Sequence, residues 1–272
     1  MLKDITLGQF FPGSSALHRM DPRMKIIITV LYVTVLFFIN NFSGFLVFFA
    51  FVYLCVAVSK IPFKFVLKGL KPLIFIIVFT GILNVFMTDG RTAFTIPFTP
   101  FRATWEGIRL AVFIIVRLVL LIMGTSILTL TSSPISLTDG IEHLLSPLNK
   151  IKMPVHELAM MMTIAIRFIP TLLEETEKIM KAQTARGADF ESGNILKRAK
   201  ALVPLLVPLF ISAFRRADEL AMAMESRCYH GGNGRTRMKQ LKFESVDYIC
   251  LSVSAAFFAA GIIAGTMKYF SF

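Results

Sequence analysis

Long runs without a single charge constrain this chain more than any other feature. Ile26–Ser59, Pro72–Thr88 and Tyr248–Met267 contain no Asp, Glu, Lys or Arg. Runs of about 20 apolar residues can cross a bilayer as helices, which satisfy their own backbone hydrogen bonds. Of the 272 residues, 55% are hydrophobic and only 17% are charged. The chain is therefore predicted to be an all-α polytopic membrane protein rather than a soluble or disordered one.

The first uncharged run is too long for one crossing. As a single helix it would measure about 50 Å, well beyond the hydrocarbon core of a bilayer. Turn-forming residues interrupt it at Asn40-Asn41-Phe42-Ser43-Gly44, which predicts two short spans at 26–40 and 43–59. Further spans are predicted at 72–88, 107–130 and 248–267, so we expect about five transmembrane helices.

The distribution of positive charge predicts the orientation. The segment before the first span holds four Lys and Arg, the loop 60–71 holds four, and region 132–247 holds sixteen. Because Lys and Arg gather in cytoplasmic loops, the N-terminus and region 132–247 are expected inside the cell. We divide the chain into an N-terminal membrane domain (1–131), a cytoplasmic domain (132–247) and a C-terminal transmembrane helix (248–272). The net charge of +12 is assigned to these loops and to the lipid bilayer, not to nucleic acid.

The cytoplasmic domain carries two long amphipathic helical patterns. Residues 153–184 and 195–225 repeat apolar side chains at helical spacing. Pro170 in the first pattern and Pro204 and Pro208 in the second predict kinks or breaks rather than straight helices. The apolar stretch Leu202–Phe214 is too short to span, so it is expected at the inner membrane surface.

Small residues predict where these two helices cross. Ala213, Ala217 and Ala221 lie four residues apart, a spacing that allows close helix approach. Alanine is also simply a good helix former.

Methionine is concentrated on the first helical pattern. Met160, Met161 and Met162 are consecutive, and Ile166 follows one turn later. Methionine is typical of surfaces that accept several partners, and filling of a core or interface explains it equally well.

Two similar phrases end the two helical patterns: AQTARGADF at 182–190 and AMAMESRCYHGG at 221–232. Arg186 aligns with Arg227 at a shift of 41 residues. The helix dipole favours a cation at a helix C-terminus by about 0.3–1 kcal/mol, which would explain one such motif. Two in one domain favour paired docking ends, because the planar guanidinium can bind a carboxylate at two points.

Two residues inside predicted spans carry separate expectations. Arg117 is either functional, as intramembrane charges often are, or extends toward the outer interface. Gly261-Ile-Ile-Ala-Gly265 predicts close packing against another helix of this chain.

The sequence contains no known catalytic, nucleotide-binding or metal-binding motif. It contains no Walker motif, no HExxH and no GxSxG, and the glycine-rich 231–236 is interpreted as a turn. The three cysteines are scattered. We therefore predict no catalytic residue, no metal site and no cofactor in this chain.

The two arginine phrases resemble the paired Ala-Arg-Gly signatures of the transmembrane T component of energy-coupling factor (ECF) transporters, which take up vitamins and metal ions. The first signature matches fully at Ala185-Arg186-Gly187. The second reads Ser226-Arg227-Cys228, so it keeps the arginine and lacks the glycine. The resemblance covers most of the chain: the N-terminal spans, the helical insert and the final span.

This resemblance implies a non-enzymatic scaffold of the bacterial plasma membrane with two crossed coupling helices. Two ATP-binding-cassette (ABC) ATPases would bind the ATP, and one or more small membrane S components would bind the cargo. Closure of the ATPases would move the helix ends and reorient the S component. The methionines and Ile166 would contact the S component, and the ATPases would dock on Ala185, Arg186, Gly187, Glu225, Ser226 and Arg227.

Two other functions remain open. A polytopic enzyme acting on lipid or prenyl substrates would need a convergent acid cluster, for which Glu174, Glu175 and Glu177 are the nearest candidates. A secondary transporter would show inverted repeats with broken helices, and the only repeat found is cytoplasmic.

Overall fold

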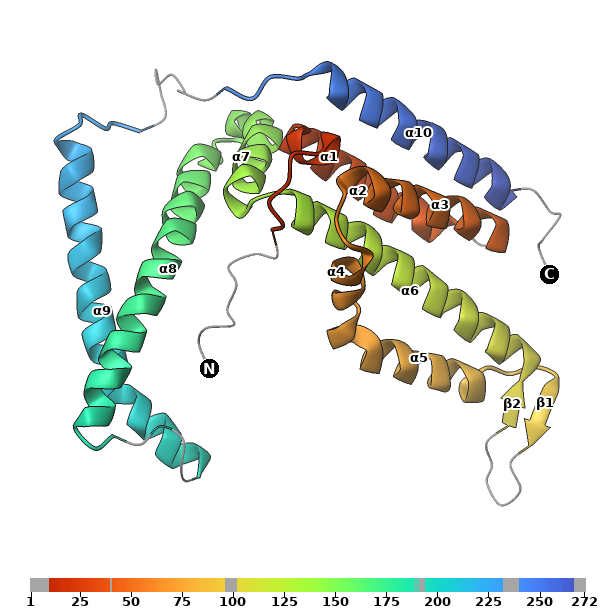
Figure 1. Cartoon of the computed structure of the whole chain (residues 1–272), viewed down its shortest axis with the longest axis horizontal. Helices are drawn as coiled ribbons and strands as arrows, with labels where there is room; N and C mark the ends of the chain where they lie inside the picture. Colours follow the sequence, from red (N-terminus) through yellow and green to blue (C-terminus); the bar gives the residue numbers. More distant parts are fainter. Residues whose placement is uncertain are drawn as a thin grey trace. The chain divides into compact units, whose positions relative to one another are not determined.

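The chain folds into helices arranged in two compact units (Figure 1). The computed structural model describes residues 10–39, 41–95, 102–188, 190, 194–231 and 240–266. One unit, the membrane unit, comprises Gly8–Gly140 and Leu241–Phe272, and the other, the arm unit, contains Ile141–Gln240. The domain boundaries expected at 131 and 247 refer to the bilayer rather than to compactness, so they stay predictions.

The membrane unit is built from helices that the uncharged runs predict. α2, α3, α6 and α10 pack together, and α5 packs on α6. The elements of this unit are α1 (Ala16–Arg19), α2 (Pro22–Phe38), α3 (Phe42–Ser59), α4 (Phe63–Lys68), a 3-10 turn (Lys71–Leu73), α5 (Ile74–Met87), β1 (Thr92–Thr95), β2 (Arg102–Thr104), α6 (Trp105–Thr131), the start of α7 (Pro134–Leu145) and α10 (Ser245–Thr266).

The predicted fold class is confirmed. Among the described residues, five helices are long and apolar enough to cross a membrane: α3, the stretch Phe63–Met87, α6, α8 (Val155–Ala185) and α10. The first expected span is α2, whose 17 residues lie at the lower limit for crossing. α8 meets the criterion because the charges of its first half are few. The sequence did not predict that β1 and β2 form an antiparallel hairpin between α5 and α6.

Aromatic side chains fill the centre of the membrane unit. Tyr32, Phe48 and Phe258 are buried, and their rings lie 5.3–6.3 Å apart. The Tyr32 hydroxyl donates a hydrogen bond to the carbonyl of Leu120 over 2.8 Å. The polar atom of the largest buried side chain is thereby satisfied, and α2 is fixed to α6.

The GxxxG sequence packs within this chain, as predicted. A Cβ added at Gly261 would stand 2.5 Å from a ring carbon of Phe48 on α3. At the same end, Asn41 and Ser43 donate side-chain hydrogen bonds to the carbonyls of Gly265 and Ala264, over 2.6 and 2.9 Å. These contacts join the start of α3 to the end of α10.

Arg117 has a structural position inside the membrane unit. Its Nη2 donates a hydrogen bond of 2.7 Å to the carbonyl of Ile39, the C-cap of α2. Its guanidinium also lies 5.2 Å from the centre of the Phe113 ring. Arg117 therefore binds a carbonyl that the helix leaves without an intrahelical partner, and this contact joins α6 to the end of α2.

A buried carboxylate connects the first residues of α2 and α10. Asp247 is 1% exposed, and its Oδ1 accepts a hydrogen bond of 2.7 Å from the amide of Asp21, the N-cap of α2. Its Oδ2 accepts one of 2.8 Å from the amide of Glu244, which directly precedes α10. One side chain thus satisfies backbone groups of two helices that lie far apart in the sequence.

We expect Asp247→Ala to destabilise the membrane unit by about 1–3 kcal/mol, because the buried amide of Asp21 loses its partner. The midpoint of thermal unfolding of the full chain in detergent measures this loss. Glu244→Ala removes an exposed carboxylate three residues away and is the matched control, with an unchanged midpoint. Equal midpoints for the two variants would contradict the prediction.

The arm unit consists of two long helices. It contains the end of α7, a 3-10 turn (Ser146–Ile151), α8 and α9 (Ile195–Glu225). Both helices continue through their prolines, Pro170 on α8 and Pro204 and Pro208 on α9, so of the predicted kinks or breaks a break does not occur. Figure 1 shows α9 bent rather than straight. Pro208 cannot donate to the carbonyl of Pro204, and the Gln183 side chain donates to that carbonyl instead, over 3.5 Å.

Candidate functional site

The end of α8 is closed by a Schellman motif. The amide of Ala188 donates to the carbonyl of Gln183 over 3.0 Å, and the amide of Gly187 donates to Thr184 over 2.9 Å. Gly187 has a φ of +87°, a left-handed conformation that suits glycine. Arg186 is the C-cap residue and is exposed. The motif therefore presents the arginine at the tip of the helix.

The end of α9 repeats this motif without a glycine. The amide of Tyr229 donates to the carbonyl of Met224 over 3.1 Å, and the amide of Cys228 donates to Glu225 over 2.8 Å. Cys228 has a φ of +55° and occupies the left-handed position. Arg227 precedes it and is exposed. Glycine is therefore not required here to end the helix, although a side chain in this conformation costs about 1–2 kcal/mol.

The shift of 41 residues also relates the backbone hydrogen bonds of the two helix ends, because donors and acceptors stand at equivalent positions. Gly187 corresponds to Cys228, and Arg186 corresponds to Arg227. Ala185, Glu225 and Ser226 are also exposed. The sequence places Cys228 at the position of Gly187, but it could not show that Cys228 adopts the same left-handed backbone conformation, because non-glycine residues do so only rarely.

We expect Cys228→Gly to tighten the end of α9 by about 1 kcal/mol, because glycine removes the strain of the left-handed conformation. Amide hydrogen exchange at residues 227–229 should slow about fivefold, the equivalent of that energy. Ser226→Gly is the control at a helical position, where glycine should speed exchange instead. A Cys228→Gly chain that exchanges at the original rate would contradict this interpretation of the motif.

A polar cluster joins α8 to α9 about two thirds of the way along each helix. Arg216 donates from Nε and Nη2 to Oε2 of Glu175, over 3.2 and 2.9 Å. The Ser212 hydroxyl donates to the other oxygen, Oε1. Near the end of α9, the Tyr229 hydroxyl lies 2.9 Å from the sulfur of Met160. Glu175, one candidate acid of the enzyme hypothesis, is therefore held in an ion pair.

The side-chain hydrogen bonds at this crossing come from Ser212 and Arg216. Ala213 is half-buried beside them, and Ala217 and Ala221 are exposed. The role of the three alanines in the crossing stays a prediction.

Both helices of the arm unit expose apolar side chains. On α8, Met161 and Met162 are 57% and 46% exposed, while Met160 and Ile166 are half-buried. On α9 the exposed apolar residues are Leu202, Val203, Leu206, Val207, Phe210, Ile211, Phe214 and Met222. Such a surface marks an interaction site for protein or membrane.

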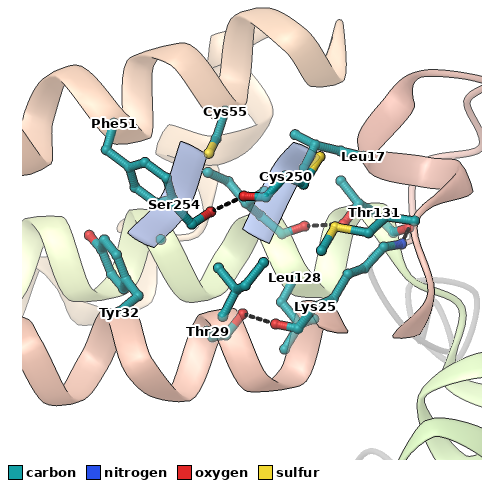
Figure 2. Close-up of a pocket in the computed structure, with 14 residues that line it drawn as sticks. Leu17, Lys25, Thr29, Tyr32, Phe51, Cys55, Leu128, Thr131, Cys250 and Ser254 are labelled. Carbon is teal, nitrogen blue, oxygen red and sulfur yellow. Dashed lines mark hydrogen bonds between the residues drawn. The ribbon is translucent and has the colours of Figure 1, made fainter. Parts of the chain in front are cut away.

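A small cavity of about 70 Å³ lies in the membrane unit (Figure 2). Tyr32, Cys55, Cys250 and Ser254 line it, with Lys25 at one side. The Lys25 ammonium is already bound by the Thr131 carbonyl, over 3.0 Å. Ligand pockets usually have several hundred Å³, so this cavity is too small for a vitamin. In the part of the chain that the structure describes, no three His, Cys, Asp or Glu residues form a metal site.

Known proteins resemble this chain over nearly its whole length. Residues 13–239 match the family model CbiQ, described as cobalt transport protein. A relative from Clostridium kluyveri, named energy-coupling factor transporter transmembrane protein EcfT, is 57% identical and covers 92% of each chain. Proteins of the same name from Ruminiclostridium cellulolyticum and Bacillus subtilis are 56% and 50% identical; they cover 94% and 91% of this chain and 96% and 93% of their own lengths.

These relatives are named as transporter components rather than enzymes. Their similarity extends over the membrane unit and the arm unit with its two arginine-bearing helix ends. This multi-pass membrane protein therefore belongs to the EcfT family, the transmembrane T components of energy-coupling factor transporters.

Proposed function

We propose that this chain transmits the energy of ATP hydrolysis from two ABC-type ATPases to a membrane S component that carries the cargo. The observation behind this proposal is the pair of matching helix ends, each with an exposed arginine at the C-cap of a Schellman motif. Two equivalent cationic tips suit two ATPases of one fold that offer equivalent acidic grooves. Ala185, Arg186 and Gly187 would dock on one ATPase, and Glu225, Ser226 and Arg227 on the other.

The exposed apolar surface of the arm unit suits the S component. Met161 and Met162 with the apolar face of α9 offer flexible side chains to another hydrophobic protein. Movement of the helix ends would be passed to the S component through this surface. The same apolar face would also rest at the inner surface of the membrane.

In this arrangement the chain needs no cofactor, because the ATPases bind the ATP. The excess of Lys and Arg in region 132–247 supports a cytoplasmic location for the arm unit. The membrane unit would lie in the bacterial plasma membrane. The cargo would be a vitamin or a metal ion, and the description of the matching family as cobalt transport protein is consistent with the latter class.

Purification of the tagged full chain from gently solubilised native membranes tests the proposal, with all co-purifying proteins identified by mass spectrometry. We expect two ABC ATPases and at least one small hydrophobic membrane protein. An untagged chain from the same membranes controls for nonspecific capture. A chain that is recovered alone, while other membrane complexes survive the same detergent, would contradict the proposal.

A further inference from the structure

The shift of 41 residues that relates the two helix ends also relates the two ion-paired residues. Glu175 stands eleven residues before Arg186, and Arg216 stands eleven residues before Arg227. These equivalent positions of the repeat are in direct contact, through the two hydrogen bonds from Arg216 to Glu175. The two helices therefore meet at the same point of the repeat.

Other contacts show that the helices run antiparallel about this point. Gln183 contacts Pro204 on one side of the ion pair, and Met160 contacts Tyr229 on the other. An antiparallel pair that meets at equivalent residues places its two arginine ends the same number of residues from the meeting point, on opposite sides of it. With a rise of about 1.5 Å per residue, each arginine lies about 16 Å along its helix from the pair. The arm unit thus has two equal lever arms.

The chemistry of the meeting point differs from ordinary helix packing. Interdigitated apolar side chains hold helices at preferred crossing angles. Here a carboxylate is bound by a guanidinium and a hydroxyl, and the Glu175 and Arg216 side chains remain 23% and 37% exposed. A partly hydrated ion pair keeps two points together by charge and tolerates rotation about them.

We propose that the Glu175–Arg216 pair, with Ser212, is the pivot about which the two coupling helices turn. This inference rests on the proposed function, because the ATPases supply the motion. Arms of equal length on the two sides of the pivot let two ATPases move both ends by equal amounts. Glu175 and Arg216 are positioning residues, which set how the arginine ends move without touching the ATPases.

Distance measurements between spin labels on the two arms test the pivot. Ala182→Cys and Ala223→Cys place labels at equivalent exposed positions, four residues before each arginine. The native cysteines are removed by Cys55→Ala, Cys228→Gly and Cys250→Ala. Distances are measured by electron paramagnetic resonance in the full complex purified with its ATPases, without nucleotide and with a non-hydrolysable ATP analogue plus Mg²⁺.

We expect the analogue to shift the distance distribution when the pivot is intact. Glu175→Arg or Arg216→Glu alone should abolish this shift and broaden the distribution, with both ATPases still bound. The double exchange, Glu175→Arg with Arg216→Glu, should restore the shift. Glu174→Arg and Arg215→Glu make the same charge changes one residue away and should behave as the unaltered pivot does.

Each result decides between the alternatives. A full nucleotide-dependent shift in the single variants would overturn the pivot, and so would a double exchange that fails to restore it. The ATPase content of each preparation is determined first. If the unaltered chain carries no ATPases, the proposed function fails and the pivot fails with it. If the ATPases are present and the nucleotide-dependent distance shift does not depend on the Glu175–Arg216 pair, only the pivot proposal fails.

Discussion

Reversing both terminal arginines, with Arg186→Glu and Arg227→Glu, will abolish binding of the ATPases to this chain. Both arginines are exposed at the tips of rigid helix ends, where they can form charge-assisted hydrogen bonds with acidic grooves. Loss of one such pair in an interface typically costs about 2–5 kcal/mol, and a reversed charge adds repulsion. We therefore expect the affinity to fall more than about a thousandfold for the double variant.

The measurement is the amount of each ATPase recovered per purified chain. Arg215→Glu is the matched control, because Arg215 is an exposed arginine on α9 that lies twelve residues before Arg227. The control should keep both ATPases, and all variants should insert and elute as folded protein. Normal recovery of both ATPases with the double variant would contradict the proposal that they dock on the two arginine ends.

The two glycines of the GxxxG sequence should respond very differently to the same change. Gly261→Ala brings a methyl group to 2.5 Å from the Phe48 ring, which is completely buried. The ring packs against Tyr32 and Phe258, so overpacking should cost about 1–3 kcal/mol. Gly265→Ala meets its nearest atom, on Ile39, only at 3.9 Å, an ordinary contact.

Thermal unfolding of the full chain in detergent measures this difference. Gly261→Ala should lower the midpoint by several degrees, while Gly265→Ala should leave it nearly unchanged. Equal effects of the two alanines would show that the close approach of α10 to α3 does not depend on Gly261. The comparison is informative because both substitutions add one methyl group to the same helix.

The arginine ends could be found from the sequence because a repeated phrase is visible without coordinates. The partner of Glu175 could not be found from the sequence. The same shift of 41 residues aligns Glu175 with Arg216, yet a repeat does not say whether equivalent residues touch. Only the antiparallel packing of α8 on α9 brings them together.

Long-range polar contacts could not be predicted from the sequence either. Asp247 stands just before an uncharged run and looks like an ordinary helix start. Its contact with the amide of Asp21 joins residues 226 positions apart. Arg117 looked either functional or exposed to the outer interface, and the structure shows that it caps α2 at Ile39. Neither partner carries a local signal, because each is a backbone group.

The sequence by itself determined the class of the protein. Uncharged runs of span length favour helices in lipid, because a helix satisfies all its backbone hydrogen bonds within one segment, and the repeated arginine motif identified the family. The tertiary structure decided how the helices use these residues: Cys228 takes the conformation of a glycine, and Glu175 and Arg216 meet at the crossing of two equal arms. Hydrophobicity and local motifs act over a few neighbouring residues, whereas helix register and crossing depend on packing between distant segments.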